Sequence, residues 1–136
     1  MDLAKFVQSA VTDVGLVCKV EEMMPAAMRE KRAKCSLPFF RSSWVADYPD
    51  AENYLSLFTT ANFAPAGPNY SHYSNPKFDV LYDKAMACTD AEERATYYRQ
   101  MDAMMMEDAP IVPLFYDEVL RFVSKRVVGL GSNHYY

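Results

Sequence analysis

The side chain with the clearest potential for chemistry is Asp47, which follows Trp44 by three residues and directly precedes Tyr48. It lies in WVADYPDAENYLSLF, where a short apolar segment passes into a Tyr-Pro-Asp turn. Proteins of the α/β class place ligand contacts just past the ends of strands, and a carboxylate there can hold a cationic group. From the local pattern alone, however, a turn aspartate that accepts backbone hydrogen bonds before Pro49 is the favoured interpretation.

Residues for catalysis are sparse. The only histidines are His72, in an irregular stretch, and His134, near the C-terminal end. No nucleophile occupies a recognisable strained turn such as GxSxG, so surface histidines without a role are favoured over a Ser–His–Asp or Cys–His arrangement. The sequence therefore predicts a protein that is not an enzyme.

Metal and cofactor sites are also disfavoured. The three cysteines, Cys18, Cys35 and Cys88, have no CxxC spacing and leave an odd thiol in any pairing, which indicates buried or idle thiols. The acidic residues between Asp47 and Glu52 are more typical of a solvated turn than of a metal site. With four glycines and neither GxGxxG nor a P-loop, we expect no cofactor.

Length and composition indicate one compact domain spanning residues 1–136. Hydrophobic residues make up 51% and charged residues 24%, and no apolar run reaches the length of a membrane span. The net charge of −4 argues against a nucleic-acid partner. The one basic cluster, Arg29–Lys34, is best explained as the solvated face of a helix.

The first third of the chain predicts alternating helices and strands. Helical spacing from Leu3 ends at Gly15, a plausible C-terminal cap. Residues 16–22 and 36–44 have the pattern of strands, and Pro25 begins a helix between them. This order predicts an α/β layer with a right-handed crossover between parallel strands. Because the first helix begins without a lead-in, we expect the chain to be a piece of a longer protein.

The middle of the chain, residues 47–75, is irregular and rich in Pro, Asn, Tyr and Gly. Long irregular stretches in compact domains are more often functional than neglected. Its tyrosines include Tyr48, Tyr54, Tyr70 and Tyr73. They suit a cleft for small polar molecules and equally suit the packing of the loop itself, and the sequence leaves both alternatives open.

Two helices and further strands are predicted after this stretch. Asn75 and Pro76 begin the first helix, and a capping box from Thr89 to Glu92 begins the second, which must end before Pro110. Residues 111–117 and 119–130 have strand patterns. The predicted buried faces of the two helices are Phe78, Leu81, Tyr82 and Ala85, and Tyr97, Met101, Met104 and Met105.

The stretch WVADYPDAENYLSLF, with GPNYSHYSNPKFDVLYDKA, TDAEERATYYRQMDAMMMEDAPIVPLFY and RVVGL in the same order, resembles a known family. These segments are similar to the C-terminal lobe of the oligopeptide/dipeptide/nickel class of extracytoplasmic solute-binding proteins of ABC importers. The resemblance covers nearly the whole chain and is strongest from Trp44 to Tyr116.

The resemblance implies a partial lobe of a type II periplasmic-binding-protein fold, with a mixed sheet flanked by helices. It implies a periplasmic or other extracytoplasmic location, an ABC permease complex as partner, and a missing N-terminal lobe that closes over the ligand. In peptide-binding members an aspartate at the position of Asp47 pairs with the ligand ammonium. The resemblance also implies that Trp44 forms an apolar wall beside that aspartate. Asn69 and Tyr70 are weaker candidate ligand contacts. Because relatives that bind nickel complexes, sugars or opines share the scaffold, a peptide is the expected solute but other small solutes stay open.

Two functions of other classes remain as alternatives. One is a small hydrolase that uses His72 with an aspartate, and the other is a self-contained α/β domain whose tyrosine-rich loop contacts another protein.

Overall fold

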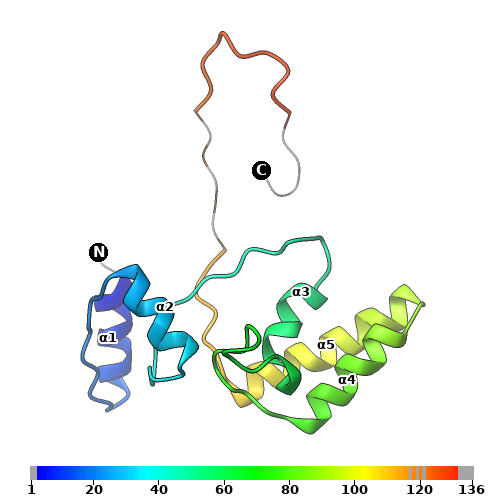
Figure 1. The fold of residues 1–136 in the computed structure, drawn as a ribbon, viewed down its shortest axis with the longest axis horizontal. Helices are drawn as coiled ribbons and strands as arrows, with labels where there is room; N and C mark the ends of the chain where they lie inside the picture. The colour runs from blue at the N-terminus through cyan, green and yellow to red at the C-terminus, as the bar shows by residue number, and fades with distance from the viewer. Residues whose placement is uncertain (1–2, 117, 119, 121, 132–136) are drawn as a thin grey trace.

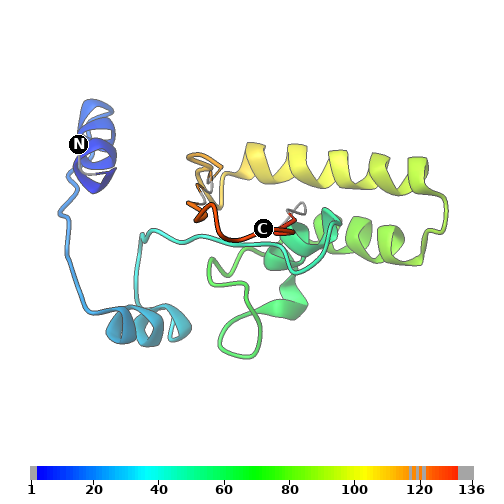
Figure 2. The ribbon, with the colours of Figure 1, turned by 90° about the horizontal axis from the view of Figure 1, so that it is seen from above.

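A computed structural model describes residues 3–116, 118, 120 and 122–131 (Figure 1). Helices α1 (Leu3–Asp13) and α2 (Pro25–Ala33) lie to one side of the remaining helices (Figures 1 and 2). The other side holds α3 (Glu52–Leu55), the short 3₁₀ helices η1 (Ser56–Phe58) and η2 (Thr60–Asn62), and the long helices α4 (Pro76–Ala87) and α5 (Ala91–Asp108).

The ends of the helices follow the local sequence. Gly15 adopts a left-handed φ of 87° and closes α1, as predicted: its amide donates to the Thr12 carbonyl, and the Leu16 amide donates to the Val11 carbonyl. Asn75 caps α4 by accepting a hydrogen bond from the Lys77 amide at 3.0 Å, with Pro76 at the first helical position, also as predicted.

The start of α5 corrects the predicted capping box. Asp90, not Thr89, is the cap, and its carboxylate accepts a hydrogen bond from the Glu93 amide at 2.8 Å. The helix therefore begins one residue later than the Thr89–Glu92 pairing predicts. Both residue types are favoured as N-terminal caps, and the aspartate, which directly precedes the first helical residue, occupies the cap position.

The core lies where α4 and α5 pack against each other and against α3 and η1 (Figure 2). The two predicted apolar faces are confirmed, because four of their members are buried and the other four pack against them. The buried residues of this cluster are Leu55, Phe58, Phe78, Ala85, Met101 and Met105. Phe78 and Met101 are fully buried and fill the space between the two long helices.

The predicted mixed sheet is not present in the part of the chain that the structure describes. Residues 16–22, 36–44 and 111–116 form no strand with a neighbouring segment, bends interrupt them at residues 38, 39 and 111, and the only bridge described joins Phe63 and Asn69. Residues 117, 119 and 121 of the last predicted strands lie outside the described residues. A strand exists only where a second chain segment accepts its backbone hydrogen bonds, and apolar alternation cannot indicate where that segment is.

The unpaired segments expose apolar side chains. Val17, Phe39 and Phe115 are more than half exposed, and Tyr116 and Phe122 are each 96% exposed. Large exposed apolar surfaces mark sites of contact with other protein.

Candidate functional site

Asp47 is exposed at the tip of a bend, residues 47–49, immediately before α3. Its carboxylate has no hydrogen-bond or ion-pair partner among the described residues. The alternative that Asp47 accepts backbone hydrogen bonds within its turn therefore finds no support in the geometry. The neighbouring residues on both sides of the bend are, in contrast, fixed to the helices.

On the N-terminal side, Trp44 fixes the bend. Its indole Nε1 donates a hydrogen bond to Oδ1 of Asn53 at 2.7 Å, and Asn53 is only 5% exposed. The Trp44 side chain nevertheless stays 40% exposed. The indole is therefore oriented by a buried partner while part of its ring remains free to contact another molecule.

On the C-terminal side, Asp50 fixes the bend to α3 and α5. Its carboxylate accepts a hydrogen bond from the Glu52 amide at 3.0 Å and lies 3.6 Å from the Arg94 guanidinium. Partial burial opposes ionisation, but the Glu52 amide, the Tyr98 hydroxyl nearby and the Arg94 charge together hold the pKa of Asp50 below its ordinary value. Asp50 is thus a charged anchor whose partners all belong to this chain.

Glu52 is a second anchor, because the hydroxyls of Tyr48 and Tyr82 donate to its two carboxylate oxygens. Burial, followed by the hydrogen bond to Glu52, raises the pKa of Tyr82. For the exposed Tyr48, the hydrogen bond to Glu52 is the main cause of a raised pKa. Of the three carboxylates between Asp47 and Glu52, only Asp47 is free to meet a ligand.

Asn69 is fully buried, and its hydrogen bonds join parts of the irregular stretch, residues 47–75, to each other. Its Nδ2 donates to the carbonyl oxygens of Thr59 and Tyr73, each at 3.0 Å, and its Oδ1 accepts from the Ser71 hydroxyl at 2.9 Å. Its own amide donates to the Asn62 carbonyl at 2.7 Å. The structure thus shows a framework role for Asn69, and its predicted role as a ligand contact stays a prediction.

Tyr70 is half-buried, and the Arg32 guanidinium lies 4.2 Å from the centre of its ring. This cation–π contact joins α2 to the irregular stretch. Tyr48 is hydrogen-bonded to Glu52 and Tyr73 packs against the core, so three of the four tyrosines contribute to the loop's own packing. Tyr48 and Tyr54 remain about equally exposed, at 46% and 45%, and among the described residues only Tyr54 of the four has no side-chain hydrogen bond or ring contact.

The structure brings together two residues that sequence reasoning kept apart, Cys35 and His72. The Cys35 Sγ lies 2.9 Å from Nε2 of His72, although 37 residues separate them. Their spacing carries no signal, because the contact depends on the path of the irregular stretch past the end of α2. Of the two alternatives predicted for the thiols, buried or idle, burial is wrong, since Cys35 is exposed and Cys18 and Cys88 are half-buried.

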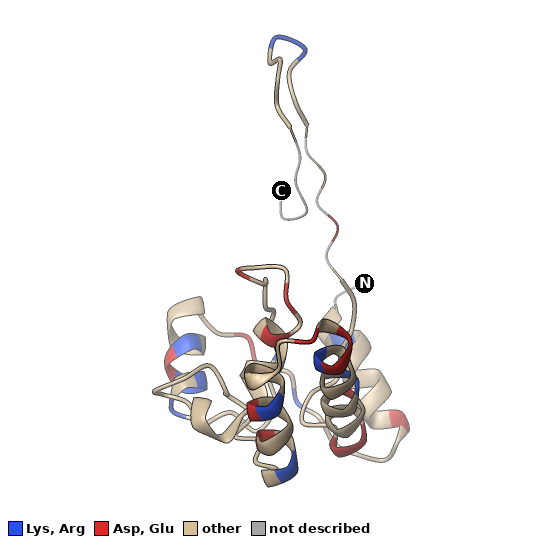
Figure 3. Cartoon of the chain, turned by 90° about the vertical axis from the view of Figure 1, so that its right-hand side faces the viewer, with Lys and Arg blue, Asp and Glu red and all other residues tan. Residues whose placement is uncertain are grey.

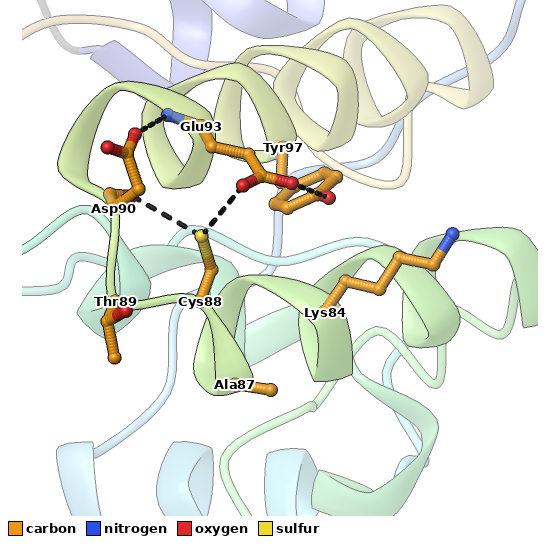
Figure 4. A pocket seen from close by; sticks show the side chains of 7 residues that line it. All are labelled: Lys84, Ala87, Cys88, Thr89, Asp90, Glu93 and Tyr97. Carbon is orange, nitrogen blue, oxygen red and sulfur yellow. Dashed lines mark hydrogen bonds between the residues drawn. The ribbon is translucent and has the colours of Figure 1, made fainter.

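An open hollow of about 400 Å³ lies at the turn between α4 and α5 (Figure 4). Its lining residues are Lys84, Ala87, Cys88, Thr89, Asp90, Glu93 and Tyr97, none of which is a predicted site residue. The Cys88 thiol points to the Asp90 carbonyl and the Glu93 carboxylate, and the Tyr97 hydroxyl donates to the same carboxylate (Figure 4).

Charges are dispersed over the surface. Lys and Arg alternate with Asp and Glu along the helices (Figure 3). Within the described ranges no group of three His, Cys, Asp or Glu side chains is placed to hold a metal ion.

The helices described there are all too short or too polar to cross a membrane. His134 lies outside the described residues.

Sequence comparison finds relatives along almost the whole chain, although no family model matches it. The chain is 27% identical over 131 residues to the probable D,D-dipeptide-binding periplasmic protein DdpA of Escherichia coli, covering 96% of this chain and 25% of that protein. It is 30% identical over 131 residues to the glutathione-binding protein GsiB of Pectobacterium atrosepticum, covering 92% and 26% respectively. The chain thus spans about a quarter of the length of these relatives.

Solved structures give the same result. The peptide-bound periplasmic binding protein DppA of Helicobacter pylori superposes with a TM-score of 0.76 at 29% identity, covering 82% of this chain and 22% of that one. The open form of the murein tripeptide-binding protein MppA superposes with a TM-score of 0.73 at 25% identity, covering 79% and 20%. Both neighbours have the type II periplasmic-binding-protein fold.

Proposed function

Because this chain belongs to the oligopeptide/dipeptide/nickel class of extracytoplasmic solute-binding proteins of ABC importers, we propose that it forms one wall of the ligand cleft of such a receptor, most often for peptides. The observation that carries the proposal is the ordered match over 92–96% of the chain to two such binding proteins. Both are named for the solutes they bind and not for a reaction, which is consistent with a chain that is not an enzyme. The proposed location is the periplasm or another extracytoplasmic space, and the proposed partner is an ABC permease complex.

The same proposal explains the missing sheet. The chain is taken to be part of the C-terminal lobe, and its extended segments at residues 16–22, 36–44 and 111–116 are taken to be strands of a mixed sheet. Their pairing partners are then supplied by the rest of the longer protein. Exposed side chains such as Val17 and Phe115 support this proposal, because they would be buried once those strands pair.

Within the cleft, Asp47 is proposed to bind the ammonium group of a peptide or other small cationic solute, with Trp44 as an apolar wall. An importer that accepts many peptides must recognise what they share, which is the backbone and the charged ends. A fixed carboxylate in a cleft that closes against water forms a strong charge-assisted hydrogen bond to an ammonium group. Asp47 fits because it is unpartnered, while Asp50 and Glu52 hold its turn in place.

Calorimetric titration of the full-length protein with a free-amino peptide and with its N-acetylated form tests this assignment. Breaking a desolvated charge pair costs about 2–5 kcal/mol, so Asp47→Ala is expected to weaken binding of the free-amino peptide about 30-fold or more. The acetylated peptide, which has no ammonium group, is expected to lose far less.

Asp83→Ala is the matched control, because it removes an exposed aspartate from the middle of α4. It is expected to leave the affinity for both peptides unchanged. Equal losses for the free-amino and acetylated peptides in the Asp47 variant would refute the ammonium assignment without touching the family membership.

A further inference from the structure

The end of α2 places Cys35 at a defined point on the surface. The Cys35 amide bonds to the Arg32 carbonyl and the Ser36 amide to the Lys31 carbonyl, each at 3.0 Å, which is the Schellman pattern of a helix end. Cys35 occupies the left-handed position of this motif with φ of 50°, where glycine is usual. Its exposed thiol is therefore held by a rigid backbone and not by a mobile loop.

His72 is fixed just as closely. Its ring stacks on Phe63 with centroids 4.7 Å apart and an interplanar angle of 15°. Its Nε2 lies 2.9 Å from the Ala64 carbonyl oxygen and 2.9 Å from the Cys35 Sγ. Stacking sets the plane of the ring, and the carbonyl sets the direction in which Nε2 points.

The two contacts of Nε2 determine its proton. The Ala64 carbonyl oxygen can only accept a hydrogen bond, so Nε2 must carry hydrogen to satisfy it. The same N–H then also points toward the Cys35 sulfur, and a thiolate accepts from it much better than a thiol does.

Cys88 offers an opposite environment within the same chain. Its sulfur lies 3.3 Å from the Asp90 carbonyl oxygen and 3.6 Å from the Glu93 carboxylate, both of which are acceptors (Figure 4). In both contacts the Cys88 thiol is the donor, whereas the sulfur of Cys35 faces an N–H group. The geometry therefore distinguishes two cysteines that the sequence treats alike.

We propose that Cys35 is a nucleophilic thiol, activated by His72, and a site of S-thiolation by low-molecular-mass disulfides. In the reaction the Cys35 thiol releases its proton to solvent, the Nε2–H of His72 stabilises the thiolate, and the sulfur attacks one sulfur of the disulfide RSSR. A new Cys35–S–S–R bond forms, the original S–S bond breaks, and RS⁻ leaves with the bonding electron pair. This site is independent of the proposed ammonium contact at Asp47.

The test uses the full-length protein with hydroxyethyl disulfide as probe, quenched at intervals with acid and mapped by peptide mass spectrometry. At pH 7 an unperturbed thiol is only a few per cent ionised, and we expect Cys35 to react roughly tenfold faster than Cys88. At pH 10, which is well above the ordinary thiol pKa of about 8.5, the two rates are expected to converge. The ratio of the pH 7 rate to the pH 10 rate thus separates activation from accessibility.

Two variants isolate His72. His72→Phe keeps an aromatic ring against Phe63 and removes the N–H, and His72→Asn tolerates the left-handed backbone at φ of 51°. Both are expected to lower the Cys35 rate at pH 7 severalfold, with the Cys35 rate at pH 10 and the Cys88 rates unchanged. A Cys35 rate at pH 7 that is no faster than that of Cys88, or that is unaffected by both variants, would overturn the proposal. A low Cys35 rate at pH 10 would overturn it too, because the thiol would then be covered in the full-length protein.

Discussion

Replacing Asn69 by alanine would remove the side chain that holds the irregular stretch together. In the structure its Nδ2 donates to the carbonyl oxygens of Thr59 and Tyr73 and its Oδ1 accepts from Ser71. Alanine leaves the Tyr73 carbonyl without its partner, whereas the Thr59 carbonyl keeps a bond from the Asn62 amide at 3.1 Å. The loss therefore falls mainly on one orphaned carbonyl, one further hydrogen bond and a small cavity.

The magnitude follows from these losses. A buried carbonyl without a partner costs about 1–3 kcal/mol, and a hydrogen bond contributes about 1 kcal/mol net. We therefore expect Asn69→Ala to lower the local stability of residues 59–75 by about 2–4 kcal/mol. Ser71→Ala removes only the hydroxyl that contacts Oδ1 and is expected to cost less than about 1 kcal/mol.

Native-state hydrogen–deuterium exchange of the full-length protein measures this quantity directly, because it reports the opening free energy of individual segments. The amides of Ala64, Gly67 and Asn69, which bond within the stretch, are the ones to follow. A loss below about 1 kcal/mol for Asn69→Ala would refute the framework role. Loss of ligand affinity without loss of protection would instead restore Asn69 as a ligand contact.

Two further predictions concern the same region. A Cβ on Gly67 would lie 2.5 Å from the Asn62 carbonyl oxygen, so Gly67→Ala is expected to destabilise the stretch by more than about 1 kcal/mol in the same exchange experiment. Hydrogen bonds from Tyr73 and Asn75 hold the pKa of Asp108 below its ordinary 3.8, so the stability it adds is present above that pH and is lost as the pH falls through the lowered value. Acid titration of Asp108→Asn should therefore show a shallower loss of stability below pH 3.8, and an unchanged acid limb would contradict this coupling.

The helices could be predicted because their determinants are local. Asn75 with Pro76, and Gly15 in a left-handed conformation, act within one turn of the residues they cap. The apolar spacing of Phe78 and Ala85 fixes which face of α4 meets α5. The cap of α5 lies one residue later than predicted, since Thr89 and Asp90 both suit it, and the short helices α3, η1 and η2 inside the stretch predicted to be irregular were not predicted.

The sheet could not be predicted from the same kind of signal. Alternating apolar residues in 16–22 show that this segment suits a strand, but a strand also needs a neighbour, which local sequence does not supply. The contact between Cys35 and His72 could not be predicted for a similar reason. It depends on the path that residues 62–72 take past the end of α2, and no spacing encodes that path.

The choice among three neighbouring carboxylates shows how structure sharpens a sequence motif. In the sequence, Asp47, Asp50 and Glu52 are all carboxylates, and each could bind a cation. The Asp50 carboxylate already forms an ion pair with Arg94 and accepts a hydrogen bond from the Glu52 amide. Both carboxylate oxygens of Glu52 accept hydrogen bonds, from the hydroxyls of Tyr48 and Tyr82. Binding a ligand through either would first break contacts that fix the turn, whereas Asp47 can bind without any such loss. The two engaged carboxylates are therefore better understood as the supports that hold the third one in position.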